Sequence, residues 1–409
     1  MRDIKILLIH SLPPKKFRFS GVEEVELLFA RHFNFESVFV HNFFVSPSRK
    51  IKNYDFDVIV LTSSFLDRIS QEKSYRLLQK NYSFLENKKS FKIGLPQDDY
   101  WAQFTRDDWY SKNLDLIVSV FDKKYWPILY PKSIKKNIKI IRGHTTYIND
   151  KNFMISKKIP FEKRKNDFVY RTSGAPFFPN KYGFLKSSIG ERFQKKHKGD
   201  FKMDISNNPK NLIFGDNWIK FLSNSKAVLG CNSGSSVILR DHRHINRLIA
   251  AKKTLNNKSK QDFEKIFFKK EDRDYELTDI SPRNIEAAKT MTLQVLFEGK
   301  YGGILKKDKD YFCLKEDFSN STELISLIKN PSKIRKITQS CYNTLKDDKS
   351  INEYIFVENI KKIIDDYLKN TPHTKKKIIK KSLKYKIFDF NFSLKFYLKF
   401  YLKKLLYNV

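Results

Sequence analysis

The feature that most limits how this chain can fold is a series of short apolar runs separated by helical patterns. In the first 150 residues the apolar runs fall at positions 5–10, 56–62, 91–95, 114–121 and 138–141. Helical patterns, such as those of residues 22–32 and 71–85, lie between several of these runs. Strands that are apolar on both faces are typical of a parallel sheet covered by helices on each side. Residues 1–150 therefore predict a doubly wound, Rossmann-like α/β domain.

A second series of the same kind begins after residues 151–165, which are polar and basic and indicate a linker. This series extends from a predicted strand at 168–170 to a long terminal helix at 352–368. We therefore expect a second Rossmann-like domain at 166–370, followed by a tail at 371–409. Two such domains tend to bind ligands in the cleft between them, at the carboxyl ends of the strands.

The composition suits folded domains in a reducing compartment. Hydrophobic residues make up 40% of the 409 residues, which is enough to form cores and too much for a disordered chain. Three cysteines without metal-type spacing exclude a disulfide scaffold and a cysteine-based zinc site: Cys231, Cys313 and Cys341. No apolar stretch approaches the length of a membrane span, so we expect a cytoplasmic protein without a membrane-crossing helix.

The net charge of +35 predicts an anionic partner, which could be a nucleic acid, an anionic membrane or a phosphorylated substrate. An alternative is that much of the lysine excess reflects AT-rich coding. The segment 371–409 differs from the rest because it holds eleven lysines and a single acid.

The end of this tail, LKFYLKFYLKKLLYNV, has the pattern of an amphipathic helix that lies in a membrane interface. Leu394, Leu398 and Leu405 fall on one face, and lysines repeat every four residues on another. Leucines and aromatic rings would enter the acyl boundary while ammonium groups meet anionic lipid. We expect the tail to hold the protein at the inner face of the cytoplasmic membrane. A helix packed on the body and a frayed basic tail are the alternatives.

Residues 280–320 carry the pattern with the clearest chemical meaning. Arg283 and Glu286 open a helix, a buried strand follows at 293–297, and Gly302 and Gly303 come after it. A carboxylate in this position can accept both hydroxyl groups of a ribose, and glycines let backbone N–H groups approach phosphate. The alternative is that Glu286 caps or salt-bridges its own helix, with Gly302 and Gly303 forming a turn.

This stretch resembles the C-terminal signature of the group 1, family 4-like glycosyltransferases, including their spore-maturation-protein-like branch. The segments SPRNIEAA, LQVLFEGKYGGIL and DFSN match that signature as a linked series. Residues 168–193 and 227–241 resemble the strand that opens the second domain and the loop before the donor site. The resemblance covers residues 1–368 and is strong in the second half. It implies a GT-B fold, in which two Rossmann-like domains face a cleft.

The resemblance also implies a hexosyltransferase that moves a sugar from a nucleotide-sugar donor to a hydroxyl group of a saccharide or lipid-linked acceptor, with retention of configuration. The pathway implied is the assembly of cell-surface polysaccharide, lipopolysaccharide or glycolipid. Many retaining members carry two glutamates here, and counting back from Glu286 places Thr278 where the first would stand. This departure leaves retention and inversion both open.

In that family, a glutamate at the position of Glu286 holds the ribose, and basic residues neutralise the diphosphate. By position, Arg171 is the first candidate for the diphosphate, followed by Lys181 and Lys186. Such cations and backbone N–H groups can stabilise the leaving diphosphate without a metal, so we expect neither a metal nor another cofactor. The predicted donor-binding residues are Arg171, Lys181, Lys186, Ser233, Gly234, Ser235, Arg283, Glu286, Gly302 and Gly303.

The loop at 232–236 is made of small and hydroxyl residues that suit close approach of a sugar or phosphate, and equally suit a strand-to-helix cap. It lacks the residue order of a P-loop, which argues against ATP hydrolysis. His242 and His244 follow at a spacing that would place them on different faces of a helix. We therefore expect a solvated basic loop there, not a metal site.

The acceptor is expected to bind to the first domain. Gly21 lies between the first predicted strand and helix, where GT-B enzymes have a loop that faces the cleft. Gln97 and Tyr100 follow the third predicted strand, and the Tyr100 ring could stack on an acceptor sugar. The alternative, both for Gly21 and for the segment with Gln97 and Tyr100, is that the residues only form the N-terminus of a helix.

Three residues are candidates for catalysis in the first domain. Asp98 or Asp99 could act as the base if the reaction inverts configuration, or could simply cap a helix. His144 lies near the predicted domain junction, where it serves either the cleft or the structure.

A second function fits the same fold, namely a non-catalytic basic protein that binds RNA or another polyanion. The lysine excess and Thr278 favour it. Because the body lacks an RNA-binding signature and a basic-aromatic platform, we expect no nucleic-acid partner. The sequence also lacks Gly-x-Ser-x-Gly and Gly-x-Gly-x-x-Gly, so hydrolase and nicotinamide chemistry have no support.

Overall fold

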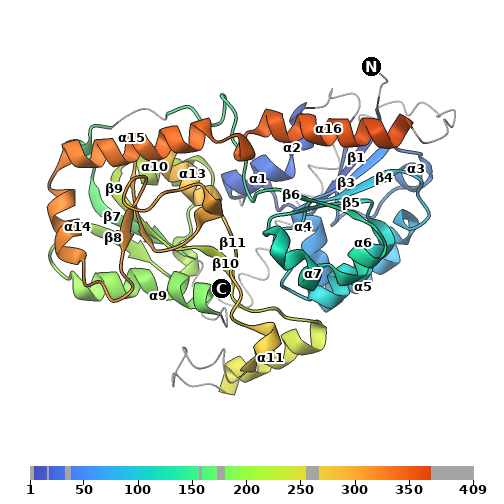
Figure 1. The fold of residues 1–409 in the computed structure, drawn as a ribbon, viewed down its shortest axis with the longest axis horizontal. Helices are drawn as coiled ribbons and strands as arrows, with labels where there is room; N and C mark the ends of the chain where they lie inside the picture. The colour runs from blue at the N-terminus through green and yellow to red at the C-terminus, as the bar shows by residue number, and fades with distance from the viewer. Residues whose placement is uncertain are drawn as a thin grey trace.

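The computed structural model describes residues 4–15, 18–32, 38–155, 159–172, 180–254 and 267–369. These residues form two α/β halves, each built on a parallel sheet (Figure 1). The prediction of parallel α/β architecture is therefore confirmed. The tail predicted at 371–409 lies outside the described residues.

The first half contains a six-stranded sheet with the order β2-β1-β3-β4-β5-β6, in which every pair is parallel. Each predicted strand is present, and β2 is an additional edge strand that the apolar runs did not indicate. The strands are β1 (Ile6–His10), β2 (Val38–Asn42), β3 (Val58–Leu61), β4 (Phe91–Gly94), β5 (Leu116–Ser119) and β6 (Lys139–Arg142).

Helices cover both faces of this sheet because its central strands are apolar on both sides. In β1, Leu7 and Ile9 belong to one core, whereas Ile6 and Leu8 belong to the other. The Leu7 face is covered by α4 (Ser63–Leu66), α5 (Glu72–Tyr82), α6 (Gln103–Asn113) and α7 (Trp126–Leu129), and the other by α1 (Ser20–Glu26) and α2 (Leu28–His32). Two further helices are α3 (Arg49–Asn53) and α8 (Pro131–Lys135).

The terminal helix α16 (Glu353–Lys369) returns to the first half and packs on the face that carries α1 and α2 (Figure 1). Phe356, Ile360 and Ile364 are buried in the same core as Ile6 and Leu8. This helix was predicted as part of the second domain, so the structure differs there. The amphipathic pattern of α16 predicts a buried face but does not say which sheet covers it.

The second half contains a five-stranded parallel sheet with the order β13-β12-β9-β7-β8. Helices α9 and α14 pack on one face, and α10, α13 and α15 on the other. The strands are β7 (Asn166–Arg171), β8 (Met203–Ser206), β9 (Ser225–Gly230), β12 (Leu293–Phe297) and β13 (Phe312–Leu314). The helices are α9 (Lys181–Lys196), α10 (Asp216–Ser223), α13 (Pro282–Lys289), α14 (Ser321–Ile328) and α15 (Pro331–Asp347).

A segment of the second half extends across to the first. It contains the antiparallel pair β10 (Ser233–Ser235) and β11 (Leu277–Asp279), with α11 (His242–Thr254) between them in the chain. In Figure 1, α11 projects beyond both sheets. Leu239 N donates a 2.8 Å hydrogen bond to Tyr100 O, and Gln103 N donates a 2.9 Å bond to Leu239 O.

The solvated basic loop expected around His242 is therefore wrong. His242 begins α11, and its Nε2 atom lies 2.7 Å from the carbonyl oxygen of Ile69 in the first half. Among the helices that the structure describes, none is both long and apolar enough to cross a membrane.

Candidate functional site

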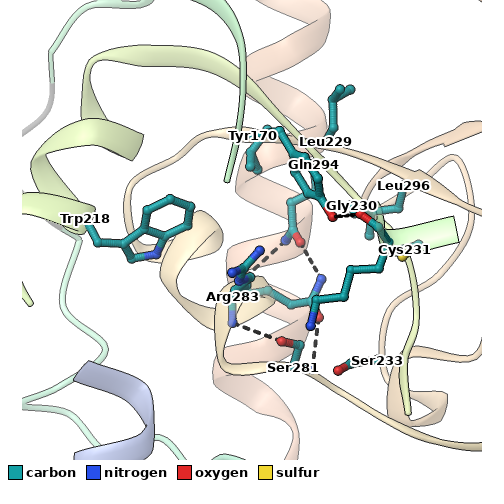
Figure 2. A pocket seen from close by; sticks show the side chains of 13 residues that line it. Tyr170, Trp218, Leu229, Gly230, Cys231, Ser233, Ser281, Arg283, Gln294 and Leu296 are labelled. Carbon is teal, nitrogen blue, oxygen red and sulfur yellow. Dashed lines mark hydrogen bonds between the residues drawn. The ribbon is translucent and has the colours of Figure 1, made fainter. Parts of the chain in front are cut away.

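An open cavity lies in the second half, where strands β7 and β9 end (Figure 2). The first residues of α13 form one side of it, and α9 and α10 contribute Lys186 and Trp218. The residues that line it are Tyr170, Lys186, Trp218, Val228, Leu229, Gly230, Cys231, Ser233, Ser281, Arg283, Asn284, Gln294 and Leu296. This is the edge of a parallel sheet at which α/β proteins bind ligands.

Two positively charged side chains, Lys186 and Arg283, line this cavity. Within the described part of the chain, no carboxylate lies within 4.0 Å of the charged nitrogens of Lys186 or Arg283. Arg283 instead donates a 2.7 Å bond from Nη1 to the Arg171 carbonyl oxygen, and its guanidinium lies 5.5 Å from the centre of the Trp218 ring. Burial lowers the pKa of Lys186, and the charge of Arg283 lowers it further. Cations held this way favour an anionic ligand.

Arg171, the first candidate for the diphosphate, has partners that hold it in the fold. Its Nη2 atom donates a 2.6 Å bond to Asp204 Oδ1, and Nη1 donates to the carbonyl oxygens of Asp204 and Tyr170. Nε donates to Asn211 O at 3.1 Å, and the group lies 4.7 Å from the centre of the Phe221 ring. Each nitrogen of Arg171 is thus already used, so the structure does not support a phosphate role for it.

Of the two lysines predicted to bind the diphosphate, the structure places only Lys186 in the cavity. Lys181 is exposed at the start of α9 and does not line the cavity. Its backbone N–H donates a 2.9 Å bond to Ser236 Oγ.

Glu286 lies on α13, one helical turn after Arg283, and is 8% exposed. Its Oε2 atom accepts a 2.7 Å hydrogen bond from the indole Nε1 of Trp218. The alternative that Glu286 caps its own helix is wrong, because Ser281 and Asn284 form the capping box of α13. The two predicted donor residues Arg283 and Glu286 therefore lie together, beside a tryptophan that no sequence pattern singled out.

Some residues of the loop at 232–236 line the cavity, and others hold the local fold. Ser233 lines the cavity, whereas the Ser235 hydroxyl bonds to the backbone of Val237 and is buried. Gly234 has φ +142°, and a Cβ there would collide with the carbonyl oxygen of Leu277 on β11. Glycine is thus required for the pairing of β10 with β11.

Gly302 and Gly303 form a turn after β12 and do not line the cavity. Both have positive φ angles, +71° and +77°, which favour glycine. Gly302 lies against Asp279, since a Cβ there would be 3.2 Å from Asp279 Oδ1. The structure therefore agrees with the turn alternative for these two residues.

Asp279 joins the two halves through a cluster that includes His144. Its Oδ1 atom accepts a 2.9 Å bond from Arg142 Nη2 and lies 3.0 Å from His144 Nδ1. Its Oδ2 atom accepts a 2.8 Å bond from Thr145 N. Gln97, predicted on the acceptor side, also lies here and donates a 3.4 Å bond to Thr145 O. The structure thus uses His144 as a contact between the halves.

Gly21 brings the halves together at a second place. It lies in α1, and a Cβ added there would be 2.5 Å from the Pro282 Cβ and 3.5 Å from Glu286 Oε1. Glycine therefore allows α1 of the first half to lie directly against the start of α13, next to Glu286. Gly21 was predicted to face the cleft, and the structure brings it to the donor-side helix.

Asp98 and Asp99 have different environments although they are adjacent. Asp98 Oδ1 accepts a 2.7 Å bond from the Tyr100 hydroxyl. Burial raises the pKa of Asp98, Asp67 raises it further, and the positive charges of Arg106 and Lys186 oppose the rise. Tyr100 itself is buried, which does not suit the predicted stacking on a sugar.

Asp99 is instead part of a buried network. Its carboxylate accepts bonds from the hydroxyls of Tyr110 and Tyr130 and pairs with Arg106 at 3.4 Å. A base needs access to its substrate, so this network favours a structural role for Asp99. The described residues also hold no cluster of three or more His, Cys, Asp or Glu side chains that could bind a metal ion.

Because burial raises the pKa of Asp99 to about 6, we expect this residue to make stability depend on pH. The folded state holds the proton more tightly than the unfolded chain, in which the pKa is about 4. The stabilising contribution is therefore full below about pH 4 and is lost as the pH rises through about 6. Relative to Asp99→Asn, the wild type should lose about 2–3 kcal/mol of unfolding free energy between pH 4 and pH 7. Urea unfolding across this range tests it, and parallel pH curves would contradict it.

No protein-family profile and no curated protein sequence matches this chain. Solved structures do match it. HepE of Anabaena, in complex with UDP, is 8% identical over 89% of this chain and 100% of that one, with a TM-score of 0.50. A glycosyltransferase from Rickettsia africae ESF-5 is 12% identical over 90% and 100%, with a TM-score of 0.46.

TarM of S. aureus is 10% identical over 75% of this chain, with a TM-score of 0.43. This chain spans only about half the length of TarM, since the match covers 54% of it. The similar structures include glycosyltransferases. At these identities the comparison shows the fold alone, and the likeness to HepE over the whole of that chain gives this protein a GT-B-like fold with two Rossmann-like halves.

Proposed function

We propose that this protein is a glycosyltransferase that moves a sugar from a nucleotide-sugar donor to a hydroxyl acceptor. The observation that carries the proposal is the pair of cations, Lys186 and Arg283, that line the cavity and have no carboxylate partner among the described residues. A nucleoside diphosphate carries the complementary negative charge, and its charge increases as the bond to the sugar breaks. Glu286, next to Arg283, is proposed to bind the ribose. HepE was solved with UDP, which makes UDP the first ligand to test.

The finer features of this proposal rest on the resemblance of residues 280–320 to the group 1 enzymes. They are a hexosyl donor, retention of configuration, and a role in polysaccharide, lipopolysaccharide or glycolipid assembly. Thr278 pairs with Gly234, and its hydroxyl is buried without a hydrogen-bond partner among the described residues. A threonine cannot supply a carboxylate to the donor sugar. If the product is inverted instead, we propose Asp98 as the base, because Asp99 is held in a buried network.

A thermal-shift panel of UDP, GDP, CMP and ADP on the wild type and Glu286→Gln tests the donor proposal. A ligand at about 100 times its dissociation constant adds roughly 2.7 kcal/mol to the stability of the form that binds it. One nucleotide should shift the wild type clearly, and the shift should be smaller for the variant. If no nucleotide in the panel shifts the wild type, the proposal is wrong and a polyanion-binding protein on this fold becomes the better hypothesis.

We also propose that the basic tail at 371–409 binds the anionic inner face of the cytoplasmic membrane, where lipid-linked acceptors are found. The lysine and leucine pattern of the tail supports this proposal. Deletion of residues 371–409 should abolish flotation with vesicles of anionic lipid and leave UDP binding unchanged. Neutral vesicles serve as the control, and equal flotation of the full chain and the deletion variant would rule the tail out as the anchor.

A further inference from the structure

Trp218 lies between the two charged groups that the proposed donor site uses. It is 8% exposed and packs in a small core with Val169 and Leu222. The edge of its ring donates the 2.7 Å hydrogen bond to Glu286, and its face lies 5.5 Å from the guanidinium of Arg283. Figure 2 shows the ring beside Arg283 at the cavity. One side chain thus contacts both the candidate ribose ligand and a candidate phosphate ligand.

The contacts of Trp218 also oppose the formation of an ion pair between Arg283 and Glu286. Arg283 and Glu286 are three residues apart on α13, a spacing at which opposite charges on a helix commonly pair. Such a pair would neutralise Arg283 and turn the Glu286 carboxylate away from a ligand. In the structure no ion pair joins these two described residues, because the guanidinium lies over the aromatic ring and Oε2 accepts the indole N–H. A guanidinium over a tryptophan face keeps a positive field that a ligand can use, whereas an adjacent carboxylate would offset that field.

The position of the ring is itself fixed. Trp218 contacts Phe221 on the same helix, with ring centres 5.6 Å apart, and Phe221 in turn lies against the guanidinium of Arg171. Arg171 donates to Asp204 on the neighbouring strand, and its carbonyl oxygen accepts the bond from Arg283. The residue first expected to bind phosphate therefore belongs to the support of Arg283.

We infer that Trp218 is a positioning residue that keeps Arg283 and Glu286 apart and directs Glu286 to the ribose hydroxyls of the donor. This inference rests on the proposed function and adds to it the origin of selectivity for a ribonucleotide. The indole N–H acts on Glu286, and the ring face acts on Arg283. The two actions can be separated because phenylalanine keeps an aromatic face but has no N–H group.

Isothermal titration of UDP, 2′,3′-dideoxy-UDP and inorganic pyrophosphate into Trp218→Phe tests the inference. We expect about a tenfold loss of affinity for UDP, which corresponds to about 1.4 kcal/mol, and less than a twofold change for the other two ligands. Trp126→Phe is the matched control, because the Trp126 N–H donates a 2.9 Å bond to Phe121 O in the first half. It should bind all three ligands like the wild type. Equal losses for UDP and dideoxy-UDP, or no loss for UDP, would overturn the inference.

A double-mutant cycle with Glu286→Gln gives a second criterion that does not need a large single effect. If Trp218 acts through Glu286, the loss in Trp218→Phe/Glu286→Gln should be close to that of Glu286→Gln alone. Additive losses would show that Trp218 acts elsewhere. If the wild type binds UDP and the folded Trp218→Phe variant binds it with the same affinity, this inference is wrong but the proposed function stands. A wild type that binds no nucleotide defeats the proposed function as well.

Discussion

Replacing Lys186 and Arg283 together by methionine is expected to stabilise the ligand-free protein and to lower its affinity for UDP by at least about 100-fold. Hydrogen bonds to charged groups contribute roughly 1.5–3 kcal/mol each, so the loss of two cations removes several kcal/mol of binding free energy. Among the described residues of the free protein these cations have no carboxylate partner, and both are partly buried. Apolar side chains in their place remove a desolvation cost. We expect the unfolding free energy to rise by about 1 kcal/mol or more.

Two arginine variants serve as controls for the expected rise in stability and the expected fall in UDP affinity. Arg243 on α11 is 91% exposed in its side chain and pairs with Asp241 on the surface, so Arg243→Met should change neither quantity appreciably. Arg171→Met should be destabilising, because Arg171 donates to Asp204 and to three carbonyl oxygens. A double variant that is less stable than the wild type but binds UDP equally well would show that Lys186 and Arg283 are structural.

Replacing Asp279 by alanine is expected to lower the free energy of unfolding by about 3–5 kcal/mol. The side chain of Asp279 is 1% exposed and pairs with Arg142 and His144. It also accepts the backbone N–H of Thr145. Removing the carboxylate leaves these donors near the junction without their acceptor. Because the contacts join the two halves, the unfolding transition should also become less cooperative in urea.

Glu358→Ala is the control for Asp279→Ala, because Glu358 forms an exposed pair with Lys361 on the surface of α16. That pair should contribute less than about 1 kcal/mol. Both variants can be compared by urea unfolding at pH 7 with fluorescence detection. An Asp279→Ala variant within about 1 kcal/mol of the wild type would mean that the contact between Asp279 and the first half does not hold the two halves together.

The central strands and the order of the two halves could be predicted because buried parallel strands are apolar on both faces, whereas the edge strand β2, which is only partly buried, could not. The return of α16 could not, since its apolar stripe fits either sheet. At the site, sequence position indicated Arg171, but the pairing of β7 with β8 brings Asp204 to it and satisfies it. Arg283 and Glu286 were predicted as a pair by their place on one helix. Trp218 was missed because it comes from a separate short helix, and only the fold brings that helix to α13.

Asp99 and His144, which were candidates for catalysis, and Asp279, which was not predicted, show why sequence position alone does not fix the role of a side chain. A carboxylate at the end of a strand can serve catalysis or a buried network, and the choice depends on tyrosines ten or more residues away. Asp279 was not singled out in the sequence, and its contact with Arg142 spans 137 positions in the chain. No local pattern carries that information.

Whether this protein transfers sugar can be decided by following nucleotide sugars by NMR while they are incubated with it. Uridine, guanosine and cytidine nucleotide sugars should be offered with and without saccharide and lipid-linked acceptors. We predict that one of them releases its nucleotide and transfers its sugar to an acceptor or to water, and that the Lys186→Met/Arg283→Met variant does neither. The anomer of the first product also decides between retention and inversion. A protein that binds the nucleotide but leaves every nucleotide sugar intact would contradict the proposed transferase activity and indicate a binding protein on a glycosyltransferase fold.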